Sequence, residues 1–287
     1  MTNCSPRGLC LAGGLLLVLC PASWAGEQTG SDENGLLLRY RFAPGEAVST
    51  RVAHRAVTET TINGTTQSVE TATDSVKTWR VTEVAPEGQT TIEHAVDDVT
   101  MTSRATGQKQ TRWQSDSIEP APPGYEGVRL SLGRPLSRLT IDCCGRVLAR
   151  RDLFPSPPSN TGDLMVVPLP DEPVRVGSSW TIPEEIVIDV PGGPRKSIRT
   201  RLRYEVADIR DTVVLIDVDT TVLTPVDDPR IKARLLERIW DGRIEFDAAE
   251  GRLLSRSASV DRRVVGFHGP QSSVHYKASR EEKLISR

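Results

Sequence analysis

The chain has 287 residues, of which 37% are hydrophobic and only 5% aromatic, and its formal net charge at pH 7 is −2. This length accommodates one large β domain or two small ones, with a sizeable buried core. A charge this close to zero gives no electrostatic basis for binding nucleic acid or an anionic membrane. We therefore expect no nucleic-acid partner.

The first 25 residues have the organisation of a secretory signal peptide. Arg7 is their single charged residue, an apolar run covers residues 9–19, and small residues precede a cleavage site after Ala25. The apolar run is too short to span a bilayer comfortably. We therefore predict a cleaved signal and a mature protein that is not transmembrane and lies in the periplasm or outside the cell. An uncleaved anchor and a lipid on Cys20 are alternatives, but Leu19 is larger than lipoprotein signals require.

Cleavage changes both the charge and the cysteine content. It removes one of the 36 basic residues and none of the 38 acidic ones, which leaves 35 against 38 and a net charge of −3. Cys143 and Cys144 then remain, and an ordinary disulfide between adjacent residues is geometrically disfavoured. An inert turn pair is the favoured interpretation. A reactive pair, a strained vicinal disulfide and an intermolecular link are the alternatives, so their redox state stays open.

Alternation of apolar and polar residues predicts the strands of the first half, after a flexible leader over residues 26–35. The first predicted strand is Leu36–Phe42. Two long stretches rich in Thr and Val follow, and Asn63-Gly64 between them is the dipeptide most typical of a tight β-hairpin. The remaining predictions for this half are strands over 48–62, 67–84 and 90–103, turns at 86–88 and 106–107, and a loop over 118–135.

Residues 155–173 contain six prolines and are predicted to form a linker. This divides the mature chain into an N-terminal β half over residues 36–154 and a C-terminal β half over residues 174–287.

The C-terminal half contains the most specific strand pattern. Apolar residues share one parity before and after a polar turn at Arg210-Asp211-Thr212, which predicts a hairpin with Ile209 opposite Val213. Opposed pairs of this kind fix the register of two strands. The predicted pairs are Tyr204 with Val218, Val206 with Ile216, Arg203 with Asp219 and, as a mildly unfavourable pair, Glu205 with Asp217.

The segment Pro229–Trp240 is ambiguous between helix and strand. Asp228 is suited to cap a helix whose first turn contains Pro229. We predict a short helix of at most Pro229–Leu236.

Two segments of the chain repeat one another. Residues 139–148 (LTIDCCGRVL) and 244–254 (IEFDAAEGRLL) each predict a strand, a turn opened by Asp and closed by Gly, and a return strand that begins with Arg. Residues 42–45 and 174–177 form a looser pair. We infer a divergent internal duplication, in which Cys143 and Cys144 occupy the positions of Ala248 and Ala249.

These motifs carry a resemblance to known proteins. The Pro-Val-x-x-Gly-x-x-Trp element at 173–180 and the Phe-Asp-x-x-x-Gly-Arg-Leu turn at 246–253 resemble elements of uncharacterised exported bacterial proteins, over about two thirds of the mature chain. The resemblance implies export and a two-halved β fold, but no activity, because the function of those families is unknown. In architecture alone, the long strands resemble the curved, half-open sheets of periplasmic lipoprotein carriers.

Asp217 and Asp219 are candidate catalytic residues. Their surroundings resemble the first motif of haloacid-dehalogenase-type phosphotransferases, which implies an Asp nucleophile, a second Asp as acid and base, and magnesium. That motif ends a buried parallel strand at the start of an α/β domain, whereas here it lies within an amphipathic strand. Exposed acids in a ladder of charges are therefore the favoured interpretation.

The four histidines and five of the arginines offer two further candidate sites. No histidine has the spacing of a metal site, although His268 and His275 can approach one another across a hairpin, so polar strand and turn residues are the favoured interpretation. A solvated sheet face is likewise favoured over a nucleic-acid-binding stripe for the arginines, and Trp180 is expected to anchor the core. The residues concerned are His54, His94, His268 and His275, and Arg199, Arg201, Arg203, Arg262 and Arg263.

We predict a mainly β fold with little helix, in which long antiparallel strands from two pseudo-repeated halves form an extended or curved, half-barrel or sandwich-like sheet. The favoured function is a non-enzymatic envelope protein that binds a protein partner or an apolar ligand, such as a lipid, through a sheet face. No catalytic, cofactor-binding or metal-binding residue is assigned. The alternative is a hydrolase with a site built on Asp217, Asp219, His268 or His275.

Overall fold

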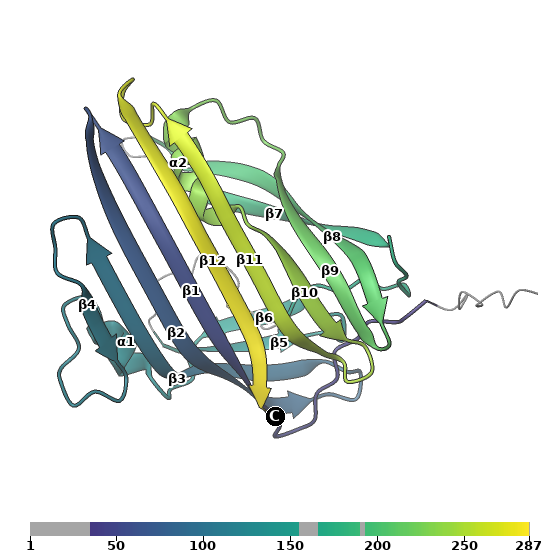
Figure 1. The fold of residues 1–287 in the computed structure, drawn as a ribbon. Helices are drawn as coiled ribbons and strands as arrows, with labels where there is room; N and C mark the ends of the chain where they lie inside the picture. The colour runs from purple at the N-terminus through teal and green to yellow at the C-terminus, as the bar shows by residue number, and fades with distance from the viewer. Residues whose placement is uncertain (1–34, 155–165, 190–192, 287) are drawn as a thin grey trace, which may run out of the picture. The chain divides into compact units, whose positions relative to one another are not determined.

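The computed structural model describes residues 35–154, 166–189 and 193–286, so the predicted signal peptide and nearly all of the predicted leader lie outside it. Twelve strands of these residues form one antiparallel sheet in the order β6-β5-β3-β2-β1-β12-β11-β10-β9-β8-β7, and β4 pairs with β3 beside this path (Figure 1). The sheet is not closed into a barrel, because β6 and β7 end it without pairing to each other. The predicted mainly β fold is confirmed.

The strands are long and the helices short. The strands are β1 (Ala47–Ile62), β2 (Thr65–Val84), β3 (Thr90–Ala105), β4 (Thr111–Gln114), β5 (Ser137–Ile141), β6 (Val147–Asp152), β7 (Ser179–Ile188), β8 (Lys196–Arg210), β9 (Val213–Val222), β10 (Asp241–Asp247), β11 (Arg252–Val265) and β12 (Ser272–Ser286). The described helices are α1 (Glu126–Ser131), α2 (Pro229–Leu235) and the 3-10 helix η1 (Leu236–Arg238). The predicted short helix corresponds to α2, whose N-cap Asp228 accepts a hydrogen bond from the Arg230 amide. The loop prediction over 118–135 is wrong at α1.

The two strongest hairpin predictions have different outcomes at their turns. Asn63 and Gly64 connect β1 to β2 with φ values of 49° and 80°, as a two-residue turn of this kind requires. All four predicted cross-strand pairs of β8 and β9 are present. The pairing of Ile209 with Val213 is wrong, because the register shifts between Val206 and Asp208 and Ile209 lies opposite Val214. A bulge in β8 therefore compensates for a turn one residue shorter than predicted.

The segment Leu36–Phe42 is not a strand of the sheet, and this prediction is wrong. Its alternation was interpreted correctly, since Leu38 is 0% and Tyr40 is 7% exposed. Its main chain, however, forms hydrogen bonds with turns: the Tyr40 amide donates to the Cys143 carbonyl at 2.8 Å and the Arg41 amide donates to the Gly251 carbonyl at 2.9 Å. The segment therefore lies between the two turns that the sequence repeats.

Both repeated turns have the predicted construction. The Asp142 carboxylate accepts hydrogen bonds from the amides of Cys144 and Arg146, and the Asp247 carboxylate accepts them from those of Ala249 and Glu250. Gly145 and Gly251 close the turns with φ values of 75° and 66°. The two turns are thus equivalent in structure as well as in sequence.

The looser repeat also has a structural counterpart. The Gly45 amide donates to Val81, whose own amide donates to Glu46, and Gly177 and Ser178 repeat this pattern with Val206. The halves also share a strand order, since β1-β2-β3-β5-β6 matches β7-β8-β9-β10-β11, and β12 joins them by pairing with β1 and β11. The two halves are therefore pseudo-repeats within one sheet.

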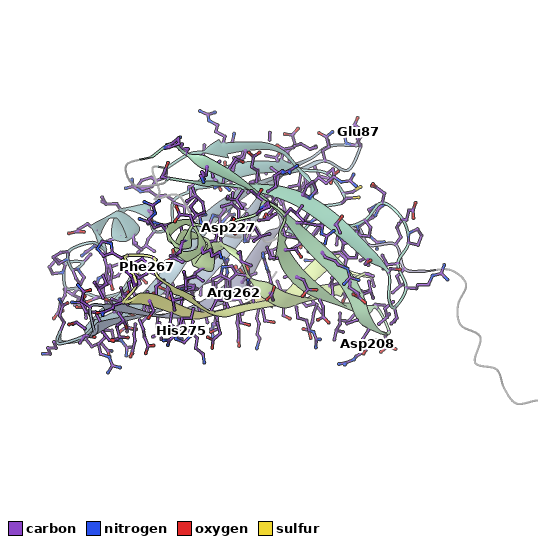
Figure 2. The ribbon with its side chains drawn as sticks, turned by 90° about the horizontal axis from the view of Figure 1, so that it is seen from above. Glu87, Asp208, Asp227, Arg262, Phe267 and His275 are labelled. Carbon is purple, nitrogen blue, oxygen red and sulfur yellow. The ribbon has the colours of Figure 1, made fainter. Side chains whose placement is uncertain are left out.

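A single core unites the two ends of the sheet. It contains Trp79 and Ile92 from the first half, Ile216 and Phe246 from the second, and Leu38 between them. The sheet therefore curls so that one face, the inner face, encloses this core. Figure 2 shows α2 on the inner side and His275 projecting from the opposite, outer side.

Substituting Ala for Gly145 or Gly251 is expected to destabilise the fold more than the same change at Gly107. All three have positive φ, which alone costs about 1–2 kcal/mol for a residue with a Cβ. A Cβ on Gly145 would lie 2.6 Å from the Val167 carbonyl oxygen, and one on Gly251 would lie 2.7 Å from that of Arg39, whereas nothing lies within 4 Å at Gly107. Overpacking adds about 1–3 kcal/mol.

Urea denaturation measures these losses as shifts in the midpoint at constant m. Equal decreases in the free energy of unfolding for the three variants would show that the two repeated turns are not packed tightly against the segment 36–42.

Candidate functional site

A cavity of about 400 Å³ lies between the inner face of the sheet and residues 166–168. These residues begin the strap, which we define as residues 166–170. The strap lies within the predicted linker 155–173, of which residues 155–165 lie outside the described part of the chain. Val166, Val167 and Leu169 of the strap are buried. The strap therefore crosses the interior and forms one wall of the cavity.

The floor of the cavity is a row of paired residues across five strands. From β12 to β8 the row is Arg280, Ala258, Gly242, Val218 and Tyr204. The two small residues in the middle of this row leave the space that the cavity occupies. A Cβ on Gly242 would lie 2.2 Å from the Ser257 carbonyl oxygen, so the backbone there leaves no room for a side chain.

The strap is fixed to both halves of the chain. The Val167 amide donates to the Tyr40 hydroxyl at 2.7 Å, and this hydroxyl donates in turn to the Val167 carbonyl at 3.2 Å. The indole of Trp180 donates to the Pro168 carbonyl at 2.9 Å and stacks on the ring of Tyr204 with centroids 5.3 Å apart. The apolar wall is therefore held in place before any ligand binds.

Trp240 forms a second apolar wall, next to η1. Its indole donates to the Glu237 carbonyl at 3.0 Å, and its own carbonyl accepts from the Thr220 hydroxyl at 2.6 Å. Its ring centroid is 6.1 Å from that of His54 on β1 and 6.5 Å from that of Tyr276 on β12. The aromatic wall thus packs against strands of the sheet.

Charged side chains from β7, η1, β10, β11 and β12 also line the cavity. Arg238, Arg256 and Arg280 line it together with Glu184 and Asp241. The pKa of the neighbouring His54 is lowered, mainly by burial and secondly by the positive charge of Arg280. Burial raises the pKa of Glu184, and the Arg256 charge acts against this rise. The cavity therefore combines apolar walls with three basic and two acidic side chains.

The inner face carries another buried charge, Glu282, next to Arg256 and Arg280. Glu282 on β12 is only 2% exposed, accepts a hydrogen bond from Thr50 at 3.0 Å and lies 3.7 Å from the Arg280 guanidinium. Arg256 and Arg280 occupy positions where the alternation of their strands calls for apolar residues. This break in the pattern was the sequence signal for the cavity, and it was missed.

The outer face has a groove of a different character. This groove, of about 460 Å³, is lined by charged residues of β1, β2, β3, β11 and β12. Arg55 pairs with Asp74 and Arg104 pairs with Glu70, each at 2.7 Å. Its charges are matched locally, as expected of a solvated sheet face.

The structure does not bring the candidate hydrolase residues together. Asp217 and Asp219 both lie on β9. Asp217 lies 2.7 Å from Arg243, and Asp219 is opposite Arg203. β10 and β11 separate them from His275 on β12, which lies 2.7 Å from Asp261 on the outer side (Figure 2). His268 is in the turn before β12. None of these four residues lines the cavity beneath the strap or the outer groove.

The other candidate residues have structural surroundings. His94 is buried and stacks on Trp79 with ring centroids 4.4 Å apart. Cys144 is a buried free thiol whose pKa is raised by burial to about 11. Arg262 pairs with Asp241 and Arg263 with Glu59. Because Arg262 and Arg263 are neighbours on a strand, their side chains point to opposite faces and do not form one stripe.

In the described part of the chain, no three His, Cys, Asp or Glu side chains are grouped to hold a metal ion. No helix of this part has the length and apolar character needed to cross a membrane.

Comparisons with known proteins identify only remote structural similarity. No family model and no curated protein sequence matches the chain. Among solved structures, lipovitellin, described for its lipid–protein interactions, has a TM-score of 0.47 and 12% identity over 86% of this chain and 26% of its own. DynF from the dynemicin pathway of Micromonospora chersina has a TM-score of 0.23 and 6% identity, covering 92% and 94% of the two chains. A DUF1329 family protein from Desulfovibrio piger has a TM-score of 0.16 and 11% identity, covering 79% and 83%. The chain thus spans about a quarter of the lipovitellin chain.

The ionisation of Tyr204 is expected to destabilise the protein at alkaline pH. Burial raises its pKa from 10.0 to about 12, so the fold favours the neutral phenol. The stability from this preference is complete below pH 10 and is lost as the pH rises through 12. Two pKa units correspond to about 2–3 kcal/mol. Tyr204→Phe should remove this part of the decline in unfolding free energy between pH 10 and 12.

Urea unfolding at closely spaced pH values checks this expectation. Tyr40 and Tyr276 titrate in both proteins, so the difference between the proteins isolates Tyr204. Parallel declines would contradict the burial of its hydroxyl beside the cavity.

Proposed function

We propose that this protein binds a small apolar or amphipathic molecule in the cavity beneath the strap and acts in the cell envelope as a non-enzymatic binding or carrier protein. The cavity itself is the observation that carries the proposal. Its volume is within the range of about 300–1,000 Å³ typical of small-molecule sites. Val167, Leu202, Val218 and Trp240 give it the apolar lining that such sites share.

Three features support a binding site rather than a packing defect. The strap is fixed by hydrogen bonds to Tyr40 and Trp180. Gly242 and Ala258 keep the floor clear, whereas a larger side chain at Ala258 would fill it. A few charged side chains stand among the apolar residues of the lining, and polar groups of this kind fix the orientation of a bound molecule. The signal-like N-terminus supports export, and with it a role in the envelope.

The ligand is sought first on the protein from its native source. Native mass spectrometry of the exported protein, purified gently from an envelope fraction, should show a reproducible added mass that is lost on denaturation. Identification of this mass as a lipid or another apolar molecule would agree with the proposal.

The location of the site is tested with the apolar fluorophore N-phenyl-1-naphthylamine. Saturable binding with one site per chain is expected in the wild-type protein. Ala258→Phe should weaken binding at least about tenfold, which is 1.4 kcal/mol, because the new ring fills the cavity. Ala258→Leu should have a smaller effect in the same direction.

Ser259→Phe is the matched control. Ser259 is the next residue of β11, is exposed and lines the outer groove instead. It should bind the fluorophore as the wild type does. The proposal is wrong if no saturable binding occurs, or if Ser259→Phe abolishes binding while Ala258→Phe retains it.

A further inference from the structure

Arg256 has an unusual position in the cavity. It lies on the inner face of β11, between Ile244 of β10 and Glu282 of β12 in register. It forms no ion pair within the described part of the chain, although Glu282 is its direct cross-strand neighbour. Glu282 instead bonds Thr50 and approaches Arg280. A half-buried guanidinium is thus left facing the cavity.

The acidic side chains of the lining offset its arginines only in part. Asp241, one of the two acids there, lies 3.3 Å from Arg262 and also accepts a hydrogen bond from the Thr220 amide. Glu184, the other acid, is exposed on β7, and its carboxylate interacts electrostatically with the Arg256 guanidinium. Arg238 and Arg280 also line the cavity, and Arg280 lies 3.7 Å from Glu282. By count, the lining has three arginines and two acids.

We propose that the ligand is an amphiphile with one anionic headgroup, a carboxylate or a phosphate, which pairs with Arg256 while its apolar tail lies against the strap. This inference rests on the proposed function and names the ligand class of the same site. A guanidinium is suited to this task, because it stays charged and presents paired N–H donors to carboxylate and phosphate oxygens.

The apolar part of the site fits such a molecule. Val167 and Pro168 of the strap face Val218 and Tyr204 of the floor across the cavity, and Trp240 forms the adjoining wall. A headgroup at Arg256 therefore lies beside a surface able to hold a hydrocarbon tail. A partly buried charge without a close ion-pair partner is unfavourable, and an anion there would relieve this cost while the tail buries apolar surface.

The test compares molecules that differ only in the headgroup. Decanoate, decanol and monodecyl phosphate compete with N-phenyl-1-naphthylamine for the wild-type protein at pH 7.5. We expect at least one of the two anions to bind about tenfold or more tightly than decanol. Comparison of decanoate with monodecyl phosphate then shows whether the site prefers a carboxylate or a phosphate.

Substitution of Arg256 assigns the effect. Arg256→Gln should reduce the preference for the anion over decanol to less than about threefold, since a charge-assisted hydrogen bond is lost. Arg256→Lys, which keeps the charge but not the paired donors, should retain part of the preference. Arg199→Gln, at an exposed position on β8, is the control and should retain all of it.

The outcomes separate this inference from the proposed function. If the fluorophore binds the cavity but decanol competes as well as both anions, the anionic headgroup is wrong and the apolar site stands. If Arg256→Gln keeps the full preference, Arg256 is not the headgroup ligand. If the fluorophore does not bind at all, the proposed function itself fails. If Arg256→Gln does not fold, the wild-type comparison still tests whether the site prefers an anion. Arg256→Lys then tests the role of Arg256, and this variant is expected to lose only part of the preference for the anion.

Discussion

The insertion of Leu36–Phe42 between two turns is the constraint on which the rest of the structure depends. A sheet that does not close must hold its two ends together by other means, or its inner face would open to water. Here the Tyr40 amide bonds one repeated turn and the Arg41 amide bonds the other. Burial of Leu38 and Tyr40 adds apolar contacts to both halves. The segment thus converts an open sheet into an enclosed interior.

The cavity follows from this closure. The Tyr40 hydroxyl holds Val167, so the same residue that joins the two halves also positions the strap. On the opposite side, Gly242 and Ala258 leave the floor without large side chains. A core of this kind would normally be packed to high density. Here, instead, a cavity remains between a fixed strap and aromatic rings that are held by hydrogen bonds. This arrangement is the structural basis of the proposed binding function.

The distribution of charge distinguishes the two faces of the sheet. On the outer face, pairs such as Arg55 with Asp74 are exposed to water and matched within the face, and exposed pairs of this type contribute little to stability. On the inner face, Glu282 is nearly inaccessible and Arg256 faces a cavity. Charges in such positions are expensive unless they are paired, which makes them informative about function.

The sequence by itself determined what depends on local chemistry. Alternation and turn residues predicted the long strands, the Asn63-Gly64 hairpin, the two repeated turns and the α2 helix, because these follow from parity, positive φ and capping. Only the tertiary structure decided what depends on residues far apart in the chain. Leu36–Phe42 alternates like a strand, but its hydrogen-bond partners are turns more than 100 residues away. The cavity likewise needs the strap, β8 and β11 together, and the charged residues on the inner face acquire meaning only once the sheet curls around them.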